Sequence, residues 1–301
     1  MKVGVLMGGI SSEREVSLKS GEGIIKNLDK NKYEVFPIII NSKKEVIEKV
    51  QGLDFVFLAL HGEFGEDGSI QALLESIGMN YSGCGVLTSA LCMDKKQTKR
   101  ILKSEGIRVA KDIKINLKNK NSSIEDLEAL GYPMVVKPNA GGSSIGVSIV
   151  RNKEELQKSI LEALKYSTEI LVEEYLEGEE YTIPVLNGEV FPILLIKSDT
   201  EFFDYVSKYA DDGATEELVT LPKELQTEFE EIGKRCWDIF NCKAYVRIDI
   251  IVSKGLPYVL EINTLPGMTK NSLFPKSAKG ANMEYSELLD KIIEYSLVWE
   301  G

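Results

Sequence analysis

The sequence has 301 residues, 43% of them hydrophobic, which is enough apolar material to fill about two or three domain cores. Its 36 basic and 47 acidic residues leave a net charge of −11 without any basic block, which excludes an obvious nucleic-acid or anionic-membrane surface. The amino terminus does not resemble a secretory signal and no apolar run reaches the length of a membrane span, so we expect a cytoplasmic protein. The four cysteines lack CxxC spacing and nearby histidines, which predicts reduced, mostly buried thiols and no zinc site.

Strand-length apolar runs alternate with helix-period segments in residues 1–85. Strands are expected at KVGVLM, YEVFPIII and DFVFLAL, and helices at residues 16–28, 43–50 and 69–77. This alternation predicts a βαβαβ unit with a buried parallel sheet, as in Rossmann-like domains.

Residues 86–178 read as a smaller α+β unit. Helices are expected at residues 95–104 and 153–166, and strands at VAKDIKI, PMVVKP, VSIV and EILVEEYL.

Residues 179–301 read as a mostly antiparallel unit. Its expected strands are EYTIPVL, EVFPILLI, AYVRIDIIVS and PYVLEIN, with Asn187-Gly188 and Lys254-Gly255 as turn signals. Helices are expected at residues 223–240 and 286–299, and a long polar loop at residues 197–217.

A glycine-rich stretch, VKPNAGGSSIGVSIV, follows the strand that ends at Lys137. Glycines let backbone N–H groups wrap phosphate oxygens, and a lysine supplies positive charge, so the stretch is a candidate phosphate-binding loop. A mobile hairpin loop is an equal alternative on this stretch alone. Lys95, which opens a helix of the same unit, would by itself more often be a surface lysine.

A second polar group lies on the two strands joined by the Lys254-Gly255 turn. Side chains alternate along a strand, so Arg247 and Asp249 lie on one face of the first strand, and Glu261 and Asn263 lie on one face of the second strand. If the turn pairs the strands, these four side chains converge, and their carboxylate and amide oxygens suit Mg²⁺. The alternative is a salt-bridge cluster on an open sheet face.

These segments, together with ILVEEYLEGEEYT and EINTLPGM, occur in an order that resembles the ATP-grasp superfamily. GGISSEREVSL, HGEFGEDGSIQALLE, DYVSKY and GMTKNSLFP narrow the resemblance to the D-alanine–D-alanine ligase family. The resemblance implies an amino-terminal substrate domain (1–85), then an ATP-grasp fold of two α+β subdomains, a central one (86–178) and a carboxy-terminal one with lid loop and metal site (179–301).

The resemblance implies a nucleotide site for ATP. Lys95 and Lys137 would contact the phosphates, with the backbone around Ser143 and Ser144 folding over them. The positions that would bind the adenosine part are Glu173, Glu180 and the backbone from Glu174 to Leu176.

It also implies a metal site and a route to an acyl phosphate. Two Mg²⁺ ions, with Mn²⁺ as a substitute, would be held by Asp249, Glu261 and Asn263. Arg247 would stabilise the oxyanion formed when the amine of the second D-alanine attacks. Lys208 would offset charge on the moving phosphoryl group.

The implied substrate contacts come from both ends of the chain. Glu13 would hold the ammonium of the first D-alanine with His61 close by, and Ser272 and the Leu273 backbone would take the carboxylate of the second. Within the lid loop, the Tyr209 hydroxyl would bond to the Ser143 side chain and keep water out.

The sequence departs from the family pattern at three positions, and other protein classes are alternatives. Gly141 replaces a common glutamate, which puts in doubt one hydrogen bond between the glycine loop and Glu13; Val246 and Asn271 also depart. Another ATP-grasp ligase, with D-serine or D-lactate as acceptor or with another amino acid, is one alternative. A non-catalytic nucleotide-binding regulator and a dinucleotide-binding oxidoreductase are less consistent with the motifs. The oligomeric state stays open, a homodimer being one alternative.

Overall fold

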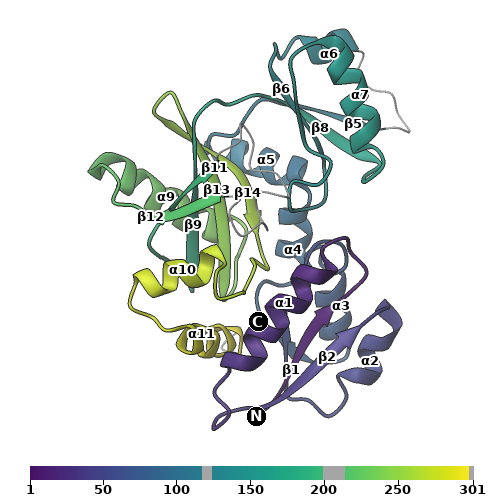
Figure 1. Ribbon diagram of the computed structural model, residues 1–301, viewed down its shortest axis with the longest axis vertical. Helices are drawn as coiled ribbons and strands as arrows, with labels where there is room; N and C mark the ends of the chain where they lie inside the picture. The colour runs from purple at the N-terminus through teal and green to yellow at the C-terminus, as the bar shows by residue number, and fades with distance from the viewer. Residues whose placement is uncertain (117–123, 199–213, 298–301) are drawn as a thin grey trace.

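The computed structural model describes residues 1–116, 124–198 and 214–297. Figure 1 shows three parts: a purple amino-terminal part, a teal central part, and a green-to-yellow carboxy-terminal part. Within these described ranges, no helix is long and apolar enough to cross a membrane. All four cysteines are free and buried, which confirms the sequence prediction.

The amino-terminal part is a parallel sheet with strand order β2-β1-β3-β4. Its elements are β1 (Lys2–Gly8), α1 (Arg14–Asn27), β2 (Glu34–Ile40), η1 (Lys43–Glu45), α2 (Val46–Lys49), β3 (Phe55–Leu58), α3 (Ser69–Ser76) and β4 (Asn80–Tyr81). Every residue of β1 after Lys2 is buried, as expected for the inner strand of a parallel sheet. The predicted βαβαβ unit is confirmed, and the short edge strand β4 is an addition to it.

The central part is an antiparallel sheet with strand order β5-β8-β6-β7, and two helices precede it. Its elements are α4 (Val86–Met93), α5 (Lys95–Ser104), β5 (Asp112–Asn116), α6 (Ile124–Glu128), β6 (Met134–Pro138), β7 (Ser148–Val150), α7 (Lys153–Ala163) and β8 (Glu169–Glu174). The sequence reading missed α4 because six of its eight residues are apolar and its two polar ones, Thr88 and Ser89, are buried while Leu87 is exposed, which leaves no amphipathic period to detect. It also missed α6, which is only five residues long.

The carboxy-terminal part is a second antiparallel sheet with strand order β12-β11-β9-β13-β14, and β10 pairs with β9. Its elements are β9 (Glu179–Leu186), β10 (Glu189–Val190), β11 (Leu194–Ser198), β12 (Ala214–Leu218), α9 (Lys223–Ile239), β13 (Tyr245–Ser253), β14 (Leu256–Asn263), α10 (Leu273–Gly280) and α11 (Tyr285–Leu297).

Both predicted hairpin turns form. Asn187 and Gly188 have φ values of 49° and 80°, and Lys254 and Gly255 have 52° and 76°. Two consecutive positive φ angles are the signature of the tight turn that suits the twist of paired strands. The Lys254-Gly255 turn therefore sets the register of β13 and β14.

The loop predicted over residues 197–217 is wrong at both ends. Residues 197 and 198 end β11, and residues 214–217 belong to β12, which pairs with β11. The sequence of β12, ATEEL, lacks the apolar alternation of a typical strand because it lies at the sheet edge, where Glu217 is exposed and Glu216 pairs with Lys276 at 2.6 Å. The missed helix α10 begins at Leu273, five positions after the end of EINTLPGM, and carries a proline, Pro275, in its first turn, where proline is tolerated.

Among the described residues three hydrophobic cores are the largest, and two of them join different parts of the molecule. The first joins β1 and β3 to α10 and α11, with Phe55 and Leu289 both fully buried in it. The second lies under the carboxy-terminal sheet and includes Cys92 of α4 and Leu102 of α5. The third, around Val136, belongs to the central sheet alone. The division at residues 85 and 178 stays a prediction.

Candidate active site

A cavity of about 380 Å³ lies between the central and carboxy-terminal sheets. Lys95 and Lys137 line it from the central part, and Glu180, Asp249 and Glu261 line it from the other. The glycine loop between β6 and β7 also borders it. The two lysines and two of the three predicted metal ligands, Asp249 and Glu261, therefore face one space.

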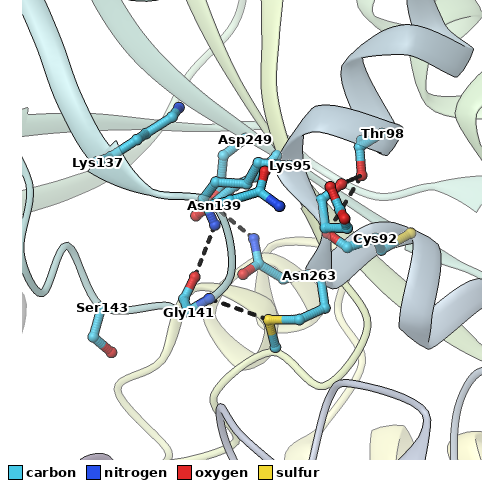
Figure 2. A network of polar contacts seen from close by, with 12 residues as sticks. Cys92, Lys95, Thr98, Lys137, Asn139, Gly141, Ser143, Asp249 and Asn263 are labelled. Atoms are coloured by element: carbon cyan, nitrogen blue, oxygen red, sulfur yellow. Dashed lines mark hydrogen bonds and ion pairs between the residues drawn. The ribbon is translucent and has the colours of Figure 1, made fainter. Parts of the chain in front are cut away.

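Lys95 is placed by the start of α5. The Asp94 side chain caps this helix by accepting from the Gln97 N–H at 2.9 Å, so Lys95 is its first residue. The Lys95 Nζ donates to the Gly141 carbonyl at 2.8 Å and lies 3.0 Å from Glu261 Oε2 (Figure 2). Burial lowers the pKa of this ammonium, but the Glu261 carboxylate outweighs burial and raises it above its ordinary value. Lys95 thus stays charged between the glycine loop and the β14 carboxylate.

Lys137, at the end of β6, lies against a buried carboxylate. Its Nζ is 2.8 Å from Glu173 Oε2, and the other oxygen of Glu173 is 2.6 Å from Lys99 Nζ. Burial lowers the pKa of the Lys137 ammonium, because the Glu173 carboxylate only partly offsets it. Burial raises the pKa of the Glu173 carboxyl, but the two lysines outweigh burial and hold it below its ordinary value.

The four polar residues of the paired strands converge as predicted. In the β13–β14 ladder Arg247 lies opposite Asn263, and Asp249 lies opposite Glu261. Arg247 donates to both Asp249 oxygens, at 2.9 and 2.8 Å, and Asn263 Nδ2 donates to Asp249 at 3.0 Å. Thr182 of β9 adds a fourth bond to Asp249, at 2.7 Å. Arg247, Asp249, Glu261 and Asn263 therefore form a strand-face cluster with Asp249 at its centre. The Asp249 side chain lines the cavity, and Figure 2 shows it beside Asn263.

The donor set of this cluster fits a hard cation only in company with a ligand. The described residues contain no group of three or more His, Cys, Asp and Glu side chains that could hold a metal. Here two carboxylates, Asp249 and Glu261, stand beside one amide, Asn263. Mg²⁺ in proteins is typically held by one or two carboxylates together with substrate phosphates and water, so the set fits Mg²⁺ bound with a nucleotide.

Glu13 joins the amino-terminal part to the glycine loop. It is 7% exposed, stands just before α1, and accepts a hydrogen bond from the Ser143 hydroxyl. Gly141 put in doubt one hydrogen bond between the glycine loop and Glu13, and the Ser143 bond is a link between them that does not involve residue 141. Ser143 and Ser144 both adopt positive φ, 52° and 56°, which turns the loop sharply at this contact.

His61 and Glu66 lie beside Glu13 in a loop after β3. The His61 Nε2 is 3.2 Å from the Ser20 hydroxyl, and burial lowers the pKa of this imidazole to about 4. Burial, reinforced by the Glu13 carboxylate, raises the pKa of the Glu66 carboxyl to about 8. At neutral pH this wall of the site therefore holds a neutral imidazole, a neutral carboxyl group and one carboxylate.

A second cavity, of about 790 Å³, opens beyond the strand-face cluster. Glu13, His61 and Arg247 line it, as do Ser272 and Leu273 at the start of α10. No side chain caps α10, and the N-terminal N–H groups of a helix favour anions. The two cavities share Asp249 and Glu261 in their walls, so they meet at the strand-face cluster.

Of the remaining predicted residues, the structure describes Glu174 and Leu176 but not Lys208 and Tyr209. Glu174 accepts from the Lys111 N–H at 2.8 Å, and β8 ends there, so Leu176 lies in the connection to β9 rather than in a strand. Both line the first cavity. Lys208 and Tyr209 lie outside the described residues.

Sequence reasoning missed two residues of the site, the buried Lys99 and the half-buried Glu66. Lys99 lies four residues after Lys95, hence on the same face of α5, which is the signal that could have found it. Glu66 lies in the quoted HGEFGEDG motif, but nothing in its sequence spacing distinguishes it from the exposed Glu63.

A parallel amino-terminal sheet followed by two antiparallel sheets, which enclose a cavity lined by lysines and carboxylates, defines an ATP-grasp protein. The D-ala D-ala ligase carboxy-terminal family model matches residues 101–294, and the amino-terminal model matches residues 2–51 and 42–84. The chain belongs to the D-alanine–D-alanine ligase family.

Relatives match along nearly the whole chain. A D-alanine–D-alanine ligase of Clostridium perfringens (strain SM101 / Type A) is 52% identical over 297 residues, which are 99% of this chain and 98% of that protein. A D-alanine–D-alanine ligase of Clostridium botulinum (strain Langeland) is 51% identical over 297 residues, 99% of each.

Solved structures match as well. A Bacillus anthracis D-alanine–D-alanine ligase complexed with ATP is 45% identical with a TM-score of 0.90, and the match covers 99% of this chain and 97% of that one. The VanG D-Ala:D-Ser ligase of Enterococcus faecalis is 30% identical with a TM-score of 0.87, covering 98% and 99%.

Proposed function

We propose that the protein joins two D-alanine molecules to D-alanyl-D-alanine, using ATP and passing through an acyl phosphate, and so supplies a peptidoglycan precursor. The observation that carries this proposal is that the two cavities meet at the Asp249–Glu261 pair. One cavity has the lysines and glycine loop suited to phosphates, and the other has the groups suited to amino acids. The γ-phosphate and a substrate carboxylate would therefore meet at the shared wall.

In the first step an oxygen of the donor carboxylate attacks the γ-phosphorus, and ADP leaves. Lys95 and Lys137 offset the charge on the transferred group, and the glycine loop donates backbone N–H groups to it. Lys208 is assigned the same role from the family resemblance. Glu13 holds the donor ammonium, and the neutral His61 lies beside it without adding charge.

In the second step the acceptor amine, having lost a proton, attacks the acyl carbon, and phosphate leaves as the peptide bond forms. Part of the Arg247 guanidinium would turn away from Asp249 and donate hydrogen bonds that stabilise the oxyanion. Ser272 and the Leu273 N–H would bind the acceptor carboxylate at the start of α10.

Mg²⁺ would be held by Asp249, Glu261 and Asn263, with Mn²⁺ as a substitute, and when bound it neutralises charge on the phosphates. The Lys95 and Arg247 cations are the groups now paired with these carboxylates, at 3.0 and 2.8 Å. They would turn from the carboxylates toward the substrates.

The test measures phosphate and dipeptide together. With ATP and Mg²⁺, D-alanine should release phosphate and give an equal amount of dipeptide, while L-alanine should do neither. D-serine and D-lactate offered beside D-alanine test the alternative acceptors, and a mixed product exceeding the D-alanine dipeptide would favour that alternative. ATP turnover that D-alanine does not stimulate would refute the proposal.

A further inference from the structure

A buried row of alternating charges runs behind the nucleotide cavity. Asp112 on β5 and Glu173 on β8 lie directly opposite each other, and like charges in that position destabilise a sheet. The Lys99 ammonium lies between them, 2.6 Å from Glu173 Oε1 and 3.6 Å from Asp112 Oδ1. Its side chain is 3% exposed, so water cannot take the place of either carboxylate.

The two oxygens of Glu173 differ in what holds them. Oε1 faces Lys99, which comes from α5 and has no other role in the site. Oε2 faces Lys137, which lines the cavity and is the proposed phosphate ligand. When a phosphate draws Lys137 away, Oε2 is left facing the cavity while Oε1 stays fixed. Glu173 then presents one hydrogen-bond acceptor in a set direction.

The walls of the cavity suit a flat aromatic ring. Val135 and Val147 line it from the central part, and Ile251 and Leu260 line it from the carboxy-terminal sheet. A purine stacked between such walls meets Glu173 with its edge. An ionised carboxylate only accepts hydrogen bonds, so it pairs with the 6-amino group of adenine and repels the 6-keto oxygen of guanine.

We propose that Lys99 is a positioning residue for purine choice: by holding Glu173 as a fixed acceptor at the cavity wall, it makes the site take adenine nucleotides and reject guanine nucleotides. The inference deepens the proposed function, because it rests on the nucleotide lying in this cavity. Lys99 does not touch the nucleotide and acts through Glu173.

The experiment measures the dissociation constants of ATP and GTP with Mg²⁺, without D-alanine, and separately kcat at saturating ATP. The native protein should bind ATP at least about 100-fold more tightly than GTP, as expected for a site built around one polar group of its ligand. In Lys99→Met, the Glu173 carboxylate loses its fixed partner, and with a nucleotide bound it should take up a proton. A protonated carboxyl group no longer favours the 6-amino group of adenine, and it can donate a hydrogen bond to the 6-keto oxygen of guanine. The ATP affinity should fall by about tenfold or more, and the ATP-to-GTP ratio with it.

Two further variants sharpen the test. Lys96→Met removes a lysine from the same helix that contacts Asp112 at 2.5 Å but not Glu173, and it should leave the ATP-to-GTP ratio within about twofold of the native value. The double variant Lys99→Met/Glu173→Gln removes one charge of each sign from the buried row, which guards against loss of folding, and its amide can face either purine. It should bind the two nucleotides within about tenfold of each other.

The outcomes separate this inference from the proposed function. Equal affinity of the native protein for ATP and GTP overturns the inference, as does an unchanged ratio in Lys99→Met or in the folded double variant. A native-like kcat in Lys99→Met at saturating ATP supports a positioning role. A protein that prefers ATP in this way but makes no dipeptide refutes the ligase function and leaves the role of Lys99 standing.

Discussion

Replacing Glu66 by glutamine should stabilise the protein increasingly as the pH rises. In the native protein, burial and the Glu13 carboxylate raise the pKa of Glu66 from an ordinary 4.5 to about 8. Between these values the unfolded chain loses the proton and the native protein keeps it, so the Glu66 carboxyl contributes a stability that falls as pH rises. Glutamine cannot ionise in either state, and its carbonyl can still accept from the Gly62 N–H, as Glu66 does at 2.7 Å.

The magnitude follows from the width of this pH window. At 1.36 kcal/mol for each pH unit, a window of about 3.5 units gives at most about 5 kcal/mol, and partial solvent access of the side chain reduces this to about 2–5 kcal/mol. Below pH 4.5 the two proteins should differ little, because both carry a neutral group. By pH 8 the difference should be close to its full size.

The assay is urea unfolding of Glu66→Gln and the native protein at pH 5, 6, 7 and 8, followed by tryptophan fluorescence. Taking the difference at each pH cancels the titrating groups that do not interact with Glu66. Glu63→Gln is the matched control, because Glu63 lies in the same loop with a side chain that is 65% exposed. A difference that stays constant with pH, or a Glu66→Gln protein that is less stable at pH 8, would show that Glu66 is ionised in the native state.

Three other substitutions test the site and the backbone. Asn263→Ala should lower kcat by roughly 10²-fold or more at saturating ATP and Mg²⁺ while the melting temperature stays close to native, and a native kcat would remove Asn263 from the metal site. Arg247→Lys keeps the charge but cannot make both bonds to Asp249, so kcat should fall far more than D-alanine affinity; a variant with only a raised KM would contradict the oxyanion role. Gly178→Ala would place its Cβ 1.9 Å from the Val252 carbonyl oxygen, so thermal unfolding should show a loss of more than about 3 kcal/mol, and a native melting temperature would mean that the backbone there yields easily.

Local sequence signals predicted the scaffold well where they coincide with packing. The Lys254-Gly255 turn predicted the pairing of β13 and β14, and the pairing in turn brought Asp249 and Glu261 together. The helix from Lys95 to Ser104 was predicted with the bounds that the structure gives, and the capping Asp94 that precedes it is a local signal for its start. Prediction failed where polar and apolar residues do not mark the buried face, as in α4 with its buried Thr88 and Ser89, and in the edge strand β12 with its two glutamates.

Other polar contacts of the site could not be predicted, because they are made by residues far apart in the sequence. The contact between Glu13 and Ser143 spans 130 positions, and that between Lys99 and Glu173 spans 74. The family resemblance assigned Glu173 to the adenosine part, but only the sheet register shows that it faces Asp112 and therefore needs a cation. The same holds for Glu66, whose pKa depends on its burial beside Glu13.

The first core of the molecule also constrains how the protein is made in the cell. Phe274 of α10 and Leu289 and Ile292 of α11 complete the apolar interior around β1 and β3, and the Gly83 N–H donates to the Ser296 hydroxyl across 213 positions. Domains usually fold in order as a ribosome releases them, but here the first 85 residues lack part of their interior until the last helix has left the exit tunnel. We therefore expect these first 85 residues to stay exposed to chaperones and proteases throughout translation. A stop codon before α11 would unfold the beginning of the chain rather than fray its end.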